Sequence, residues 1–329
     1  MAKFLLRRLA SSIVLVAIAA SLAYVLAAAS LSPRSNFEGR NPPPPPAVVE
    51  RQLDERNLND RTPILERYGR WLSGVARADF GLSWDGTSIN AEMARRIGVS
   101  LRLLLIATVI GSVLGVLAGA WGAVRQHRPS DHTVTFLSFV ILSTPVFVLA
   151  VLLEIVAVAV NDATGVSVFE YTGEFTPGLE GGFWTHAVDR LQHLVLPTLT
   201  LVLAEIAIFS RYQRSAMLDV LGADFVRTAM AKGLRRRTAL LKHALRTALI
   251  PTATFLAYNF GLLLVGATFI ETIFGWHGMG EWFIESVRRN DVNAVASVSC
   301  FAAVLVLLAG LLSDLAYAAL DPRIRVGKA

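Results

Sequence analysis

The chain has 329 residues, of which 54% are hydrophobic and only 17% are charged. A mean hydropathy of +0.53 excludes an ordinary soluble globular protein and indicates a chain that lies in a bilayer. In a soluble protein a net charge of +6 would suggest nucleic acid, but in a membrane protein basic residues are interpreted by their position between spans, so we expect no nucleic-acid partner.

Six stretches are apolar over roughly the 20 residues that a helix needs to cross a bilayer. The sequence therefore predicts an all-α integral membrane protein with six transmembrane helices, at Leu9–Leu31, Leu101–Val124, Val134–Val160, Leu194–Ser210, Ile250–Phe274 and Ala294–Leu320. We divide the chain into an N-terminal transmembrane helix (1–31), an external segment (32–100), a five-helix core (101–320) that includes a basic loop (211–249), and a tail (321–329).

The first span has an alternative interpretation as a secretory signal peptide, because Lys3, Arg7 and Arg8 precede its apolar run. That run, Leu9–Leu31, is longer than the roughly 7 to 15 apolar residues of a signal peptide. We therefore expect the first span to be retained as a helix.

The external segment begins with a proline run, Pro42–Pro46, for which we expect extended polyproline II structure. Apolar residues then recur at three- and four-residue steps and predict a helix that ends before Asp79–Leu82; they are Ile64, Leu65, Tyr68, Trp71, Leu72 and Val75. A second amphipathic stretch, with Ile89, Met93 and Ile97, leads into the second span. The segment is either a cap packed over the spans or a docking surface for a soluble partner.

The loop between the fourth and fifth spans carries nine basic residues against two acidic ones, which predicts a cytoplasmic location. The segment between the third and fourth spans is acidic and is expected outside, so both termini are expected in the cytoplasm. The external segment 32–100 also holds many basic residues, but the charge rule fails for segments above about 60 residues.

Within the basic loop, Asp224–Gly233 is predicted to form a short helix with an acidic start, which glycine ends in a left-handed conformation. A second helix is expected from about Thr238 until Pro251 opens the fifth span. This helix-turn-helix elbow is a solvated connector, a site for anionic lipid at Arg235–Arg237, or a docking surface. Phe225, Ala229 and Gly233 recur at four-residue steps and favour docking into a partner's groove.

Here the sequence resembles the integral-membrane subunits of binding-protein-dependent ABC importers, specifically the first permease of the dipeptide and oligopeptide branch. The family's cytoplasmic signature is matched by Ala229, Gly233 and Ile250-Pro251. Further family-like segments are Gly81–Ser83, Ser143–Phe147, His193–Pro197, Arg211–Leu221, Glu271–Phe274 and Asp321–Arg325. Two segments depart from the family pattern: His277–Gly280, where the family has proline before glycine, and Asn290–Asn293.

The resemblance implies the type I importer fold in a bacterial plasma membrane and makes the elbow a coupling helix that docks on an ATPase subunit. The implied coupling residues are Asp224, Phe225, Arg227, Thr228, Ala229, Lys232 and Gly233. The implied partners are a second homologous permease, two ATPase subunits, an extracytoplasmic solute-binding protein and membrane lipid. No cofactor is expected on this chain, because ATP and Mg belong to the ATPase subunits.

Ionisable residues within spans are costly and call for a functional hypothesis. Glu154 and Glu205 are the candidates for the translocation path, where either meets a peptide's amino group or forms an ion pair with the partner permease. Pro145 and Pro197 are expected to bend their helices. The single Cys300 and the scattered histidines offer no metal-ligand spacing.

The sequence contains no phosphate-binding loop of the form Gly-x-x-x-x-Gly-Lys-Ser/Thr, so the energy source is expected on other chains and this chain is expected not to be an enzyme. Two alternatives stay open. One is an ion-coupled secondary carrier that uses Glu154 and Glu205. The other is an importer of a non-peptide cargo such as a nickel complex, glutathione or haem.

Overall fold

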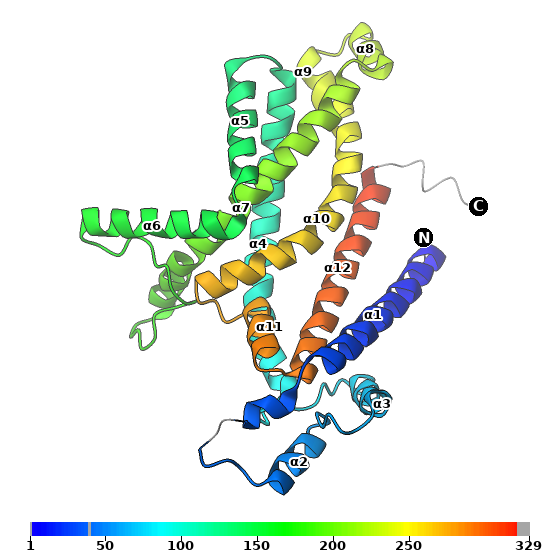
Figure 1. The fold of residues 1–329 in the computed structure, drawn as a ribbon. Helices are drawn as coiled ribbons and strands as arrows, with labels where there is room; N and C mark the ends of the chain where they lie inside the picture. Colours follow the sequence, from blue (N-terminus) through cyan, green and yellow to red (C-terminus); the bar gives the residue numbers. More distant parts are fainter. Residues whose placement is uncertain (1, 39–40, 321–329) are drawn as a thin grey trace. The chain divides into compact units, whose positions relative to one another are not determined.

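The computed structural model describes residues 2–38 and 41–320, and Figure 1 shows its helices. The elements follow in the order α1 (Ala2–Ser30), the 3-10 helix η1 (Pro33–Phe37), α2 (Pro46–Glu55), α3 (Ile64–Val75), α4 (Ile89–Val124), α5 (Pro129–Ser143), α6 (Val146–Thr164), α7 (Phe183–Leu221), α8 (Asp224–Ala231), α9 (Arg236–Ala239), the π-helix η2 (Leu240–Ala244), α10 (Leu245–Ile273), α11 (Met279–Arg288) and α12 (Val292–Leu320). The predicted tail, 321–329, with its family-like Asp321–Arg325, lies outside the described residues.

Among the residues that the structure describes, five helices are long and apolar enough to cross a membrane: α1, α4, α6, α7 and α12. A sixth span results when the bent helix over Arg236–Gly261 and Gly266–Ile273, whose parts meet at 50°, is counted as one. The predicted all-α membrane class is confirmed, and six spans are reached when the bent helix is included.

The third predicted span, Val134–Val160, is not one continuous helix. Instead α5 ends at Ser143 and α6 begins at Val146. Pro145 has no amide hydrogen to continue the helix and disfavours helical geometry in the residue before it, and Thr144 is accordingly extended, with ψ 121°. In Figure 1, α6 runs across the direction of α5. We predicted a bend at Pro145; the structure has a break.

Two other prolines lie inside helices. Pro197 is within the 39-residue α7, which extends the predicted span Leu194–Ser210 at both ends. Pro251 was predicted to open the fifth span, but it lies inside α10, which continues η2 without a gap. That prediction was wrong because proline removes only one hydrogen bond, and neighbouring helices in a membrane protein can stabilise the continuous helix.

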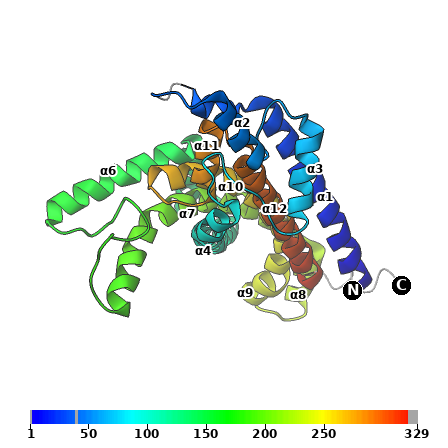
Figure 2. The same ribbon diagram turned by 90° about the horizontal axis from the view of Figure 1, so that it is seen from below.

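The chain forms two compact units, and the first comprises the described residues up to Leu101 together with His277–Leu307. In this unit α1 and α3 lie side by side (Figure 2). Tyr24 of α1 stacks on Trp71 of α3 with ring centroids 4.7 Å apart. Tyr24, Trp71, Leu53 of α2 and Val292 of α12 are buried in one core cluster.

The helix predicted from the spacing of apolar residues in the external segment is confirmed as α3, Ile64–Val75. Its buried face is narrower than the spacing predicted, because Leu65 is 80% exposed and Leu72 is 40% exposed. The second amphipathic stretch is also confirmed: Ile89 and Met93 are buried at the start of α4, in a cluster with Trp282 of α11. Pro46, predicted as extended, instead begins α2, where a missing amide hydrogen costs nothing.

The segment Asn290–Asn293, which departs from the family pattern, covers the end of the turn after α11 and the first two residues of α12. The Asp291 carboxylate accepts hydrogen bonds from the amide of Ala294 (3.1 Å), the amide of Trp84 (3.3 Å) and the hydroxyl of Ser83. Burial raises the pKa of the Asp291 carboxyl above its usual 3.8, and these hydrogen bonds oppose the shift. Asp291 thus joins the external segment to the start of α12.

The second unit comprises Arg102–Trp276 and the described residues from Leu308 onward. In this unit three glycines of α4 let its backbone approach that of α7, and we call this contact the α4–α7 seam. A Cβ atom would lie 2.3 Å from the Glu205 Cβ at Gly111, 2.6 Å from the Phe209 Cβ at Gly115 and 2.3 Å from the Ser210 carbonyl oxygen at Gly119. At Gly122 the nearest atom would be the Oδ1 of Asp131 on α5, at 3.0 Å. Each of the first three distances is shorter than real Cβ contacts, so these positions require glycine.

Candidate functional site

The predicted elbow is present between α7 and α10. α8 begins at Asp224 and ends at Ala231, and Gly233 follows in the left-handed region with φ +91°. The amide of Leu234 donates to the Ala229 carbonyl (3.2 Å), which closes the turn after the helix. The prediction that glycine ends this helix in a left-handed conformation is confirmed.

One face of α8 is anchored in the second unit. Val226 is 1% exposed and Ala229 is 9% exposed, and both belong to a core cluster with one residue of α4, one of α7 and four from the α9–α10 segment: Ala123, Met217, Ala239, Leu240, Ala244 and Ala248. α8 is therefore packed against the ends of three long helices.

The opposite face of α8 is exposed and carries most of the predicted coupling residues. Phe225 is 43% exposed, and Asp224, Arg227, Thr228, Lys232 and Gly233 are also exposed. The sequence placed Phe225, Ala229 and Gly233 on one docking face, but in the structure Ala229 lies in the chain's own core. The four-residue spacing correctly predicted a helix, but spacing alone cannot show whether a face is covered by the same chain or by a partner.

The second half of the elbow begins at Arg236, two residues before the predicted Thr238, and passes through η2 into α10. Arg235, Arg236, Arg237 and Lys242 are exposed on it. Together with Arg227 and Lys232, these cations give the elbow a positive surface, which suits either an acidic protein groove or anionic lipid.

A buried ion pair joins α5 to α7 near the elbow. Arg214 donates to Asp131 through Nε (2.6 Å) and Nη2 (2.8 Å), and the His127 amide adds a third hydrogen bond of 3.2 Å. Asp131 is 1% exposed. The hydrogen bonds from Arg214 lower the pKa of the Asp131 carboxyl, which keeps it ionised.

Glu205, the first of the two path candidates, is enclosed by its own chain. It is 2% exposed, its Oε1 accepts a hydrogen bond of 2.6 Å from Asn259 of α10, and its Cβ lies against Gly111. Eight residues along α7, Gln213 makes the same kind of contact and accepts 2.6 Å from Thr252 of α10. The arrangement is that of polar contacts between two membrane helices.

Glu154, the second path candidate, is half-buried on α6 and makes no hydrogen bond or ion pair with any residue in 2–38 or 41–320. The structure thus separates the two glutamates by environment: Glu205 is held in the interior, and Glu154 remains available. Whether either contacts cargo stays a prediction.

Sequence reasoning missed the glycine seam and the Asp131–Arg214 pair. The seam had a visible signal, since Gly111, Gly115 and Gly119 stand at steps of four, the spacing that lets membrane helices pack closely. The ion pair had none, because 83 residues separate its partners.

Comparisons with known proteins agree with this geometry. The family model described as "Binding-protein-dependent transport system inner membrane component" matches residues 111–326. The chain is 55% identical to the oligopeptide transport system permease protein OppB of Mycobacterium tuberculosis over 326 residues, covering 99% of this chain and 100% of that protein.

More distant relatives include the oligopeptide transport system permease protein AppB of Bacillus subtilis, 34% identical over 84% of both chains. The dipeptide transport system permease protein DppB of Escherichia coli is 31% identical over 80% of this chain and 81% of its own. The chain belongs to the family of binding-protein-dependent transport system inner membrane components.

Proposed function

We propose that this chain is a permease subunit of an ATP-binding-cassette importer of short peptides, and that separate ATPase subunits drive it by docking on the elbow. The observation that carries the proposal is the two-sided α8: Val226 and Ala229 anchor it, while Phe225 and the cations around it face outward. The names of the relatives, which are peptide permeases, support the cargo class.

The remaining assembly follows from the same proposal. A second homologous permease completes the pathway, two ATPase chains hold ATP and Mg, and a solute-binding protein delivers cargo on the outer side. The elbow and both termini face the cytoplasm of a bacterium, in agreement with the density of exposed arginines on the elbow. ATP-driven closure of the ATPases displaces α8 and rocks the bundle between outward and inward access.

An ion-coupled carrier is less well supported. Such a carrier needs a titrating group that changes exposure, whereas Glu205 is bonded to Asn259 and packed on Gly111. These contacts favour a role in joining α7 to α10.

The first test replaces Phe225, the exposed aromatic residue of α8, with glutamate. Phe225→Glu adds a charge where a partner buries an aromatic ring, so we expect the affinity for the ATPase subunits to fall at least about tenfold. Co-purification of the complex, followed by its ATP hydrolysis rate, measures the loss. Phe183→Glu makes the same change at a phenylalanine that is 78% exposed outside the elbow, and it should leave assembly unchanged. Equal assembly of both variants would contradict docking through α8.

A second test compares two exposed glycines of the same loop. Gly233 has φ +91° and Gly222 has φ −91°, and neither has an atom near its missing side chain. Left-handed geometry costs a residue other than glycine about 1–2 kcal/mol, so Gly233→Val should distort the elbow, whereas Gly222→Val should not. In reconstituted complexes we expect Gly233→Val to lower peptide uptake per ATP hydrolysed severalfold. Coupled transport at the wild-type ratio would refute the assignment.

A further inference from the structure

The helix α3 of the first unit carries an exposed apolar stripe in addition to its buried face. Tyr68 and Trp71 pack in the core cluster with α1, whereas Leu65 is 80% exposed and Leu72 is 40% exposed. Gly69 lies between the two leucines and is also exposed. Leu65, Gly69 and Leu72 follow one another at steps of four and three residues, so they form one stripe along the helix. We call this surface the leucine stripe.

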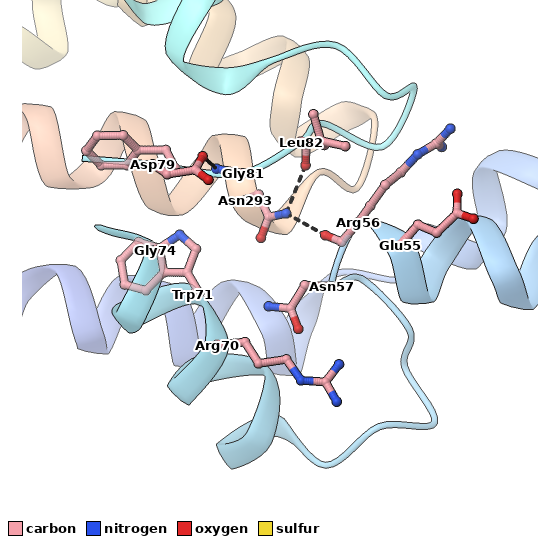
Figure 3. Close-up of a pocket in the computed structure, with 11 residues that line it drawn as sticks. Glu55, Arg56, Asn57, Arg70, Trp71, Gly74, Asp79, Gly81, Leu82 and Asn293 are labelled. Atoms are coloured by element: carbon pink, nitrogen blue, oxygen red, sulfur yellow. Dashed lines mark hydrogen bonds between the residues drawn. The ribbon is translucent and has the colours of Figure 1, made fainter. Parts of the chain in front are cut away.

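The charged side of α3 lies away from the leucine stripe. Figure 3 shows Arg70, Trp71 and Gly74 of α3 at a cavity of about 310 Å³. Glu55 and Asp79 add charge to the lining of this cavity, and no residue of the leucine stripe belongs to it. At 3.6 residues per turn, Arg70 and Gly74 lie on nearly the opposite side of the helix from the stripe. The exposed part of α3 is therefore amphipathic, with charge toward the cavity and apolar surface away from it.

The contacts of α3 place it beside the membrane-spanning part of α1, which covers Arg8–Ser30. The hydroxyl groups of Ser21 and Tyr68 form a hydrogen bond of 2.8 Å. Tyr24 stacks on Trp71 with ring centroids 4.7 Å apart. At a rise of 1.5 Å per residue, Ser21 lies about 14 Å and Tyr24 about 9 Å before the end of the span. Both contacts are thus within one leaflet, since half of the hydrocarbon core is about 15 Å thick.

The exposed surface of α1 at this level is apolar as well. Leu22 is 59% exposed and Leu26 is 65% exposed, and a helix that crosses the bilayer presents such side chains to lipid. A single exposed leucine on a protein in water needs no explanation, but the leucine stripe belongs to a helix that touches α1 inside its span. The aromatic residues at the contact are also of the kind that is enriched where a membrane meets water.

We propose that α3 is an interfacial helix and that its leucine stripe inserts into the leaflet that holds the end of α1. The partner of this face is the lipid surface, which is the outer leaflet in the orientation proposed above. An amphipathic helix of this kind buries its apolar side in the boundary between headgroups and acyl chains. The inference goes beyond transport and does not depend on it, because it concerns only residues of the first unit.

The test measures the depth of single spin labels on the full-length chain in liposomes. Leu65→Cys and Leu72→Cys place the label on the leucine stripe, and Ser73→Cys places it on an exposed residue of the polar side. Collision rates with oxygen and with a water-soluble nickel complex give the depth. We expect the two stripe labels about 5–10 Å below the boundary between headgroups and acyl chains, and the Ser73→Cys label in water.

The unsubstituted chain supplies the background, because its single thiol, Cys300, is buried. All three substituted positions are exposed, so the thermal unfolding midpoints should stay near that of the wild type. Stripe labels that collide with the nickel complex as often as the Ser73→Cys label would overturn the proposal. That result would make a soluble partner the occupant of the stripe.

Thiol reactivity gives an independent readout on the same variants. A maleimide attacks from water and needs the thiolate, which apolar surroundings disfavour, so Leu72→Cys should react at least about tenfold more slowly than Ser73→Cys in liposomes. Leu22→Cys, on the lipid-facing side of α1, should be as slow as Leu72→Cys. The three rates should become similar when the chain is unfolded in dodecyl sulfate. Equal rates for Leu72→Cys and Ser73→Cys in liposomes would overturn the insertion of α3, whether or not the chain transports peptides.

Discussion

Gly119→Ala is expected to destabilise the second unit by about 3 kcal/mol, at the upper end of the cost of overpacking a close contact. The added methyl group would lie 2.3 Å from the Ser210 carbonyl oxygen and 2.9 Å from the Arg214 amide nitrogen. Both are backbone atoms of α7, so no side-chain rotation can relieve the clash. Close packing of this kind is one of the main forces that hold helices together in a membrane, so the loss should be visible in the stability of the unit.

Gly98→Ala is the matched control on the same helix. A methyl group added at Gly98 would have no atom within 4 Å, so alanine there should be neutral or should stabilise α4 by up to about 1 kcal/mol through its higher helix propensity. Thermal unfolding of the detergent-solubilised variants, followed by size-exclusion chromatography, measures both effects. A Gly119→Ala protein as stable as Gly98→Ala would show that α4 and α7 do not pack as described.

Removal of the Arg214 side chain is expected to cost about 3 kcal/mol at pH 7, because it leaves the buried Asp131 carboxylate without its partner. This value is the lower end for a buried pair, since Arg214 keeps 28% of its side chain exposed. Arg214→Lys keeps the charge but loses the bidentate hydrogen bond, so its free energy of unfolding should lie between those of Arg214→Ala and the wild type.

The same pair predicts a pH dependence with a definite sign. The pKa of Asp131 in the folded chain is below its usual 3.8, so the carboxylate stabilises the folded state above that pH. The contribution is lost as the pH falls through the lowered folded pKa. The stabilities of wild type and Asp131→Asn in chemical unfolding should therefore differ most near pH 7, and the difference should shrink as the pH falls below 3.8. A stability difference that does not shrink at any acidic pH at which the chain stays folded would argue against an ionised Asp131.

Local signals in the sequence predicted local structure well. The spacing of Ile64, Tyr68, Trp71 and Val75 gave α3 its observed ends, and Gly233 marked the end of α8, because both depend on residues a few positions apart. Hydropathy located the spans because it shows which stretches of the chain lie in the bilayer. It does not show the direction in which the chain runs, so the apolar stretch around Pro145 was predicted as one span although the chain turns there.

Features that join distant residues were not predictable in this way. The burial of Ala229 depends on Ala123 and Met217, which lie more than ten residues away from it along the chain. The hydrogen bond between Glu205 and Asn259 was not predictable either, since 54 residues separate the two. A single sequence gives no measure of such proximity.

The core beneath α8 has an unusual composition whose consequence is mechanical. Five of its eight buried residues are alanines, and alanine has no side-chain torsion that can rotate to accommodate a shift. The buried centre of this core therefore has few side chains that can rotate when α8 moves. If an ATPase subunit pushes on Phe225 as we propose, most of the displacement should pass to the ends of α4, α7 and α10 as movement of whole helices.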